Sequence, residues 1–248
     1  MKANKHLLFA AILLLTSFIN SNSFAQNGYY FLTDQGLTIW KEPYKGWKEV
    51  ADATLDSSTV DTLTISEGIG MVTFDSKNGP SFLVSSFEHG DCKLYAEVLL
   101  PHNGKAGLLL QGRYEIILAD SALISDSIPN LSNIGAIAPR MRADSLVDGK
   151  VPRKNAFSKR GRWQTIEVFF KAPRFGEKGV KISYAKVWVK VNGVTVQNGV
   201  ELVNSTFGGQ NKAERLTGPV VFAGKQSDVA FRNVTLKRLK MKNDYHPY

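Results

Sequence analysis

The sequence predicts an all-β protein, a single jelly-roll sandwich of two antiparallel sheets. Short runs rich in β-branched and aromatic residues recur along the chain, with Gly, Pro and Asn between them. After the N-terminal segment no stretch sustains the 3.6-residue period of an amphipathic helix. The 248 residues, 43% of them hydrophobic, suffice for one large sandwich with an ordinary core.

Four segments predict strands most clearly. Residues 93–100 alternate apolar and polar side chains, and residues 163–170 are aromatic and β-branched. Residues 186–197 predict a hairpin, because two β-rich runs flank Asn192-Gly193, the pair favoured in a type I′ turn. Residues 228–239 predict a last strand. Residues 120–160 are instead polar and arginine- and lysine-rich, a long excursion of the kind that is usually functional or mobile.

The N-terminus has the layout of a secretory signal peptide. Lys2 and Lys5 precede an apolar run over residues 7–19, and Ser-Phe-Ala at 23–25 supplies the small residues of a cleavage site. We predict cleavage after Ala25, which leaves a single domain over residues 26–248 in the periplasm or outside the cell. The apolar run is too short for a comfortable permanent membrane anchor, so no stable membrane insertion is expected after cleavage.

Composition excludes several classes of function. The lone cysteine, Cys92, excludes a disulfide framework and a cysteine-based zinc site, and its place on a predicted strand favours a buried thiol. The formal net charge is +9, but the basic residues are scattered, which favours solvated surface charge. Together with the secretory signal, this disfavours a nucleic-acid partner.

Residues 111–120, Gln-Gly-Arg-Tyr-Glu-Ile-Ile-Leu-Ala-Asp, place charged side chains in an otherwise apolar double run. If the run is extended, Gln111, Arg113 and Glu115 share one face. If Gly112-Arg113 forms a tight hairpin, Glu115 lies opposite Leu110. In either case Glu115 and Asp120 differ in parity, so without a bulge they point to opposite faces.

The local spacing does not favour an ordinary glycosidase. A retaining glycosidase needs two carboxylates about 5 Å apart, and the Glu-x-Asp-x-x-Glu pattern that would supply them on one strand is absent. The structural alternative for Glu115 is a carboxylate paired with Arg113 or a nearby lysine, and the local pattern favours neither role. The four tryptophans are either sugar-stacking platforms or, more commonly for strand tryptophans, packing residues: Trp40, Trp47, Trp163 and Trp188.

The order of several short motifs resembles the 3-keto-disaccharide hydrolase domain family, formerly a domain of unknown function. The resemblance runs from about residue 47 to residue 239. The motifs that carry it are Gln111-Gly-Arg-Tyr-Glu115, Asp120-Ser121, Asn155-Ala156, Gly161-Arg-Trp-Gln-Thr165, Phe170-Lys-Ala-Pro-Arg-Phe175, Asn192-Gly-Val194, Thr217-Gly-Pro219 and Val229-Ala-Phe-Arg-Asn233.

The resemblance implies a concanavalin A-like jelly roll, secretion, and sugars oxidised at C3 as substrates, cleaved by hydrolases or lyases. A C3 ketone acidifies the C2 hydrogen, so one base forms an enolate that expels the glycosidic oxygen on C1. By position in the family motif, Glu115 is the candidate base and Arg113 the candidate stabiliser. Gln111, Asp120, Trp163 and Arg232 are the candidate substrate-binding residues. A divalent cation held by Glu115 and Asp120 is an alternative to Arg113.

The chain departs from the family in one place. Members carry a histidine shortly after the Thr-Gly-Pro motif, whereas residues 221–228 here read Val-Phe-Ala-Gly-Lys-Gln-Ser-Asp. If that histidine orders the site, its loss slows catalysis, alters specificity or leaves a binding module. Two readings therefore stand: an enzyme that cleaves 3-keto-glycosides, and a non-catalytic, lectin-like carbohydrate-binding sandwich. Convergence of Arg113, Glu115 and Asp120 in one cleft is the criterion that distinguishes them.

Overall fold

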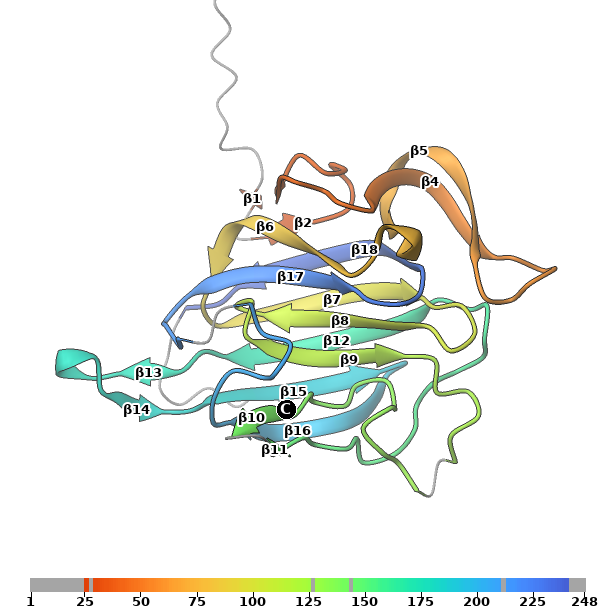
Figure 1. The fold of residues 1–248 in the computed structure, drawn as a ribbon. Coiled ribbons are helices and arrows are strands. Elements are labelled where there is room, and N and C mark those ends of the chain that lie inside the picture. Colours follow the sequence, from red (N-terminus) through yellow and green to blue (C-terminus); the bar gives the residue numbers. More distant parts are fainter. Residues whose placement is uncertain (1–24, 27–28, 126–127, 143–144, 211–212, 241–248) are drawn as a thin grey trace, which may run out of the picture.

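The computed structural model describes residues 25–26, 29–125, 128–142, 145–210 and 213–240. Residues 1–24 of the predicted signal peptide and the C-terminal residues 241–248 lie outside this part. The predicted sandwich is confirmed, because two antiparallel sheets pack face to face, with the five-stranded sheet in front of the nine-stranded sheet in Figure 1. Within the described residues no helix is long and apolar enough to cross a membrane.

The larger sheet has nine strands among the described residues. Along its main path the order is β1 (Ala25–Gln26), β2 (Tyr29–Phe31), β18 (Val229–Arg238), β7 (Cys92–Leu99), β12 (Gln164–Lys171), β15 (Ala185–Val191) and β16 (Val194–Leu202). A branch, β5 (Leu63–Phe74) and β4 (Trp47–Leu55), pairs with one end of β18.

The smaller sheet has the order β3 (Trp40–Lys41), β6 (Ser81–His89), β17 (Gly218–Gly224), β8 (Lys105–Leu110) and β9 (Tyr114–Ala119). Two hairpins stand outside both sheets, β10 (Arg140–Arg142) with β11 (Ser145–Val147), and β13 (Arg174–Phe175) with β14 (Lys181–Ser183). The second hairpin projects from the body at the left of Figure 1. Single-turn 3-10 helices cover Ser76–Asn78 and Glu177–Gly179.

The alternation read from the sequence decides which side chains enter the core. Leu94, Ala96 and Val98 of β7 face inward, as predicted, and Phe231 of β18 stacks on Phe222 of β17 across the core with ring centroids 4.1 Å apart. The lone cysteine is buried and free, and burial raises the pKa of its thiol. Apolar side chains from the facing sides of the two sheets thus form one continuous core.

The predicted hairpin at Asn192-Gly193 is confirmed. Both residues have positive φ, 50° and 77°, as a type I′ turn requires, and they join β15 to β16. The polar excursion over residues 120–160 packs along the outer edge of β9. The N–H of Ile117 donates to the carbonyl of Ala136, and the N–H of Ala138 donates to the carbonyl of Glu115.

Candidate functional site

The hairpin of β8 and β9 sets the direction of every charged side chain in residues 111–115. Its turn is Gln111-Gly112, with φ of 53° and 64°, and the N–H of Arg113 donates to the carbonyl of Leu110 at 3.0 Å. Leu110 pairs with Tyr114, so residues 111–113 form a three-residue loop and Glu115 lies opposite Leu109. Both arrangements considered from the sequence are wrong, since the run is not extended and the loop has three residues, 111–113, rather than the two of a tight turn at Gly112-Arg113.

Glu115 points away from the core, onto the outer face of the five-stranded sheet, yet its side chain is only 4% exposed. Its carboxylate forms an ion pair with the ammonium of Lys225, which follows β17. Two glycines leave room for it: a Cβ at Gly107 would lie 2.6 Å from Oε1, and a Cβ at Gly208 would lie 2.3 Å from Oε2. The sequence left pairing with a lysine open as the structural role of Glu115, and the structure contains that pair.

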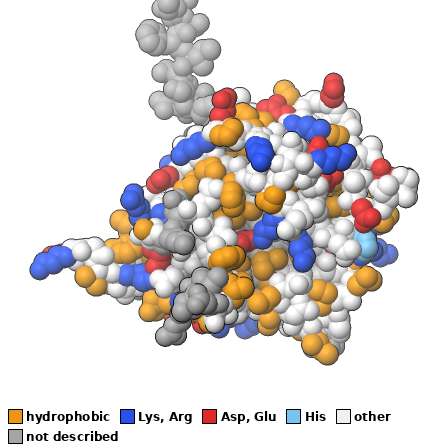
Figure 2. Space-filling model, in the orientation of Figure 1, with side chains coloured by type: hydrophobic (Ala, Val, Ile, Leu, Met, Phe, Trp, Pro, Cys, Tyr) orange, Lys and Arg blue, Asp and Glu red, His pale blue; other side chains and the backbone are white. Residues whose placement is uncertain are grey.

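The surface beside this ion pair is partly apolar and partly basic. Leu109, Val221 and Ala223 form a buried cluster on the outer face of the sheet, packed against Val84. Val84 also lines a hollow of about 590 Å³, which lies three strand spacings, roughly 14 Å, from Glu115. The hollow is lined by Lys41, Glu42, Pro43, Lys45, Ser81, Phe82, Val84, Glu88, Gln210 and Pro219. Figure 2, which views this face, shows hydrophobic side chains near its middle with lysine and arginine side chains among them. The arrangement suits a ligand with both apolar and polar surface.

Arg113 is buried and binds main-chain carbonyls. Its Nε donates to Ala213 at 2.7 Å, and its Nη1 donates to Gln111 and Thr217, each at 3.0 Å. Burial lowers the pKa of this guanidinium. The Arg113 guanidinium thus links the β8–β9 turn to segment 213–217. It fixes the loop that leads into β17.

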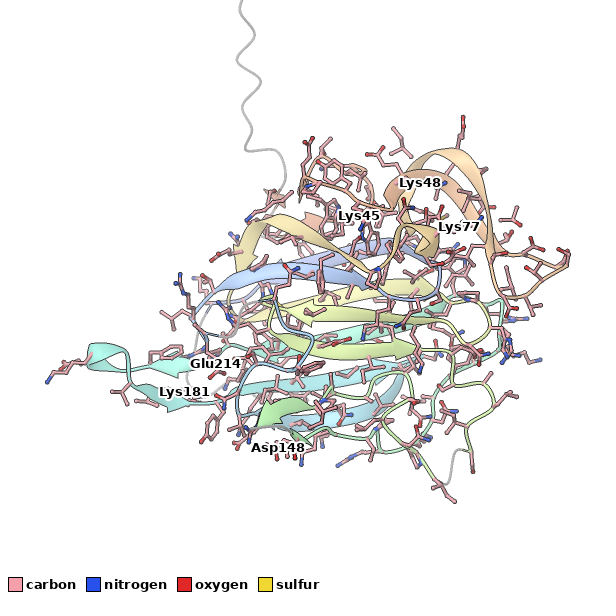
Figure 3. The ribbon with its side chains drawn as sticks, viewed as in Figure 1. Lys45, Lys48, Lys77, Asp148, Lys181 and Glu214 are labelled. Carbon is pink, nitrogen blue, oxygen red and sulfur yellow. The ribbon has the colours of Figure 1, made fainter. Side chains whose placement is uncertain are left out.

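The same loop is held at two further points. Thr206 donates its hydroxyl to the carbonyl of Arg113 at 2.9 Å and accepts the N–H of Glu115 at 3.1 Å. Glu214 accepts hydrogen bonds from the buried Tyr114 hydroxyl and from Lys181, and the ion pair of Lys181 and Glu214 is visible in Figure 3 at the base of the β13–β14 hairpin. Residues 206–208 are thereby pressed against Glu115.

Gln111 is buried beside a neutral histidine. Its N–H donates to Nε2 of His89 at 3.0 Å, so that nitrogen is unprotonated and Nδ1 donates to the carbonyl of Gly90 at 2.8 Å. Burial lowers the pKa of His89 to about 4. The side-chain amide of Gln111 donates to the carbonyls of His89 and Leu216, and its Oε1 has no hydrogen-bond partner among the described residues. Gln111 thus ties the turn to the same loop.

Asp120 lies at the opposite end of β9 from Glu115. It accepts the N–H groups of Asn103 and Ala122 and pairs with Nε of Arg160 at 2.9 Å. Five residues of extended chain separate the two carboxylates by roughly 16 Å at about 3.3 Å per residue. They therefore cannot hold one ion, and the predicted shared cation site does not fit this geometry. In the part of the chain that the structure describes, no three His, Cys, Asp or Glu side chains gather as a metal site.

Trp163 and Arg232 lie together, but on the outer face of the other sheet. The guanidinium carbon of Arg232 is 4.2 Å from the centroid of the Trp163 ring, and its Nε donates to Glu97 at 2.7 Å. The core separates this pair from Glu115. Trp40 and Trp47 are core residues, and Trp188 packs edge-on against Phe169. The six predicted site residues thus fall into three places.

Lys225 is the residue that sequence reasoning missed. It stands in the stretch where the resemblance expects a histidine and finds none. The sequence carried a signal for the face of Lys225 but not for its partner: Val221, Ala223 and Lys225 alternate with the core residue Phe222 and so point to the outer face.

The sequence and the fold can be compared with known proteins. The model of the 3-keto-alpha-glucoside-1,2-lyase-like domain matches residues 32–237. No protein with a curated description matches the chain.

Similar crystal structures include two proteins of Parabacteroides distasonis, each described as a "putative glycosyl hydrolase". One has 21% identity and a TM-score of 0.56, with 86% of this chain and 84% of that chain covered. The other has 14% identity and a TM-score of 0.55, with 86% and 100% covered. These likenesses support the fold, and the family match covers most of the sequence. The chain therefore belongs to the family of 3-keto-alpha-glucoside-1,2-lyase-like domains.

Proposed function

We propose that this protein is an exported, carbohydrate-active enzyme that cleaves the glycosidic bond of 3-keto-glycosides, with Glu115 as the base. One observation carries the proposal: in a chain of this family, a buried carboxylate paired with a lysine lies on the outer face of the smaller sheet, the face on which a hollow of about 590 Å³ opens at Val84. A base for C2 and a cation for the enolate are the groups that this chemistry needs.

The reaction requires few groups. Glu115 takes the proton from C2, which the C3 ketone acidifies, and the electron pair forms an enolate. Lys225 stabilises the enolate oxygen by its positive charge. The enolate re-forms the ketone and expels the oxygen on C1, which receives the proton from Glu115. The product of elimination is an unsaturated keto sugar, and addition of water across its C1–C2 double bond completes hydrolysis.

Access to Glu115 requires a local movement. The carboxylate is covered by Gly208 on one side and paired with Lys225 on the other. The side chain of Lys225 is 34% exposed and has a flexible four-carbon stem, so it moves more easily than the loop that Arg113 and Thr206 fix. A substrate that draws the ammonium onto its C3 oxygen frees Glu115 at the same time. No step is assigned to a metal, because Glu115 and Asp120 do not fit a shared ion.

The test is product formation from a chromogenic 3-keto-glucoside. We expect turnover by the wild type and a loss of about 10²- to 10⁴-fold in Glu115→Gln, the range for removal of a general base. Turnover that is equal in the two proteins, or absent from a correctly folded wild type, contradicts the proposal. Insensitivity to EDTA is expected as well.

The second candidate is the non-catalytic, lectin-like sandwich. It is favoured by the failure of Arg113, Glu115 and Asp120 to converge, and by the aromatic and cationic pair of Trp163 and Arg232 on the remote sheet. Under this alternative, the intact sugar binds saturably without turnover, and Trp163→Ala weakens binding. Binding that is unchanged in Trp163→Ala counts against it.

A further inference from the structure

A second cleft lies beyond the outer edge of β9 and the segment 135–138 bound to it, between the β10–β11 hairpin and β16. Its volume is about 520 Å³, enough for a sugar residue and its ordered water. It is lined by Ile137, Ala138, Arg140, Asp148, Lys150, Asn198, Gly199, Val200, Glu201, Leu202, Val203, Asn204 and Thr206. Asp148 marks its β10–β11 side at the lower front of Figure 3. None of the substrate-binding residues predicted from the sequence lines it.

One wall of the cleft offers main-chain hydrogen-bonding groups. Among the described residues β16 pairs with no strand other than β15, so alternate N–H and C=O groups point away from that partner. Two carbonyls near the ends of this wall already accept hydrogen bonds, Val196 from the N–H of Arg153 and Val203 from the ammonium of Lys181. The register slips opposite Trp188, where β16 has two residues, Asn198 and Gly199. Gly199 has a φ of 67°, and a Cβ there would lie 3.4 Å from the Trp188 indole. Such a bulge re-aims side chains, and here Asn198 is exposed at the cleft.

The other walls are polar and held in place. Arg140 donates from Nε to Asp148 at 2.6 Å, and Glu201 pairs with Lys186 at 3.0 Å, so both carboxylates at the rim have cation partners. Gln197 fixes the floor by donating to the carbonyls of Gly135, Lys150 and Val151. Lys150 and Asn198 add exposed donors.

These features select the chemistry of the ligand. Among the described residues, no aromatic side chain lines the cleft, and side chains of both positive and negative charge line it, which disfavours an apolar molecule and a polyanion. The bulge breaks the regular register that an added peptide strand needs. A neutral polyhydroxylated molecule satisfies edge-strand carbonyls, amides and paired ions together.

The cleft is connected to the main chain of the candidate catalytic residue through Thr206. Thr206 lines the cleft and receives the N–H of Glu115, and two residues later Gly208 covers the Glu115 carboxylate. We propose that this cleft is a carbohydrate-binding subsite for an unoxidised sugar residue of the substrate, distinct from the surface beside Lys225. The proposal deepens the proposed function and rests on it for the sugar class.

The test is titration with unoxidised disaccharides (sucrose, trehalose and maltose), followed by amide and indole NMR signals of the full chain. We expect saturable shifts at Asn198, Gly199 and the Trp188 indole, in the wild type and in Glu115→Gln alike. Asn198→Ala and Lys150→Ala should each weaken binding about tenfold. The matched control is Lys178→Ala, which removes the same charge from the exposed 3-10 turn between β13 and β14.

Two outcomes overturn the subsite. One is the absence of saturable shifts up to about 50 mM, well beyond a millimolar Kd. The other is shifts confined to Lys225 and its neighbours. Failure of the proposed function is separate: saturable shifts at the cleft in a wild type without turnover leave a binding site and remove the enzyme. Normal turnover without cleft binding removes only the subsite.

Discussion

Two ion pairs lie on the outer faces of the two sheets, and they differ in what surrounds them. Glu115 pairs with Lys225 beneath the loop that Arg113 and Thr206 fix, and Gly107 and Gly208 leave space for its carboxylate. Glu97 pairs with Arg232 and also accepts from Asn233 and Tyr95. Burial raises the pKa of Glu97, but the hydrogen bonds from Asn233, Arg232 and Tyr95 outweigh it, and the pKa is lowered. The two glutamates therefore differ in the groups that surround each carboxylate, and these groups, rather than the residue type, distinguish a candidate base from a structural carboxylate.

The largest expected effect separates the two carboxylates directly. Glu115→Gln should lose turnover as stated above, whereas Glu97→Gln, the matched control on the far sheet, should keep it within about twofold, since a remote surface change alters little. Steady-state kinetics on the chromogenic substrate measures both. Equal losses in the two variants would break the comparison.

The clearance around Glu115 gives the second prediction. Gly107→Ala puts a Cβ 2.6 Å from Oε1 and should displace the carboxylate, lowering turnover about 10²-fold, as misplacement of a catalytic group does. The circular dichroism spectrum should stay that of the wild type. Gly176→Ala is the control, because its Cβ would only approach Ile182 at 3.2 Å. Full activity in Gly107→Ala would show that the position of Glu115 is unimportant.

Acid should lower the free energy of unfolding in two pH windows, the first set by His89 beside the β8–β9 turn and the second, at lower pH, by Glu97 on the far sheet. The pKa of His89 is lowered to about 4 from 6.5, so the unfolded chain binds this proton first and stability falls as pH drops from about 6.5 towards 4. The loss is on the order of 3 kcal/mol. The pKa of Glu97 is lowered from 4.5, so its contribution to stability is present above pH 4.5 and is lost as the pH falls below 4.5. Urea unfolding against pH measures the first window, and NMR titration of the His89 ring assigns it. Protonation of folded His89 near pH 6.5 would contradict the account.

The smallest effect is expected on the far sheet. Arg232→Met removes the cation over Trp163 and one partner of Glu97, at a partly exposed site where such contacts contribute about 1 kcal/mol. Urea unfolding should show that loss with turnover unchanged. A clear fall in sugar binding by Arg232→Met would instead favour the lectin-like alternative.

The sequence predicted the fold more fully than the site. Alternation identified the inward face of β7, and the pair Asn192-Gly193 identified the turn between β15 and β16, because Asn and Gly tolerate positive φ. Glutamine rarely adopts positive φ, so the sequence did not indicate that Gln111 belongs to the loop, with a φ of 53°. The loop has three residues instead of the expected two, which changed the residue opposite Glu115 from Leu110 to Leu109.

The other misplacements arise from long-range contacts. The family motifs grouped Arg232 with Glu115, and alternation could not correct this, because it tells which face of its own strand a residue occupies but not which sheet the strand joins. The partner of Glu115 lies 110 residues away along the chain, and no local pattern indicates such a pair. The family motif marked Glu115, and only the folded chain supplied Lys225.

The central claim is that Glu115 removes the C2 proton of a 3-keto sugar. The most direct measurement is proton NMR of a 3-keto-glucoside with the protein in D₂O. A C3 ketone acidifies the hydrogens on both C2 and C4, so C4 serves as an internal control. The account predicts deuterium incorporation at C2 well above the rate at C4 with the wild type, and none above background with Glu115→Gln. Equal incorporation at C2 and C4, or C2 exchange that persists in Glu115→Gln, would contradict it.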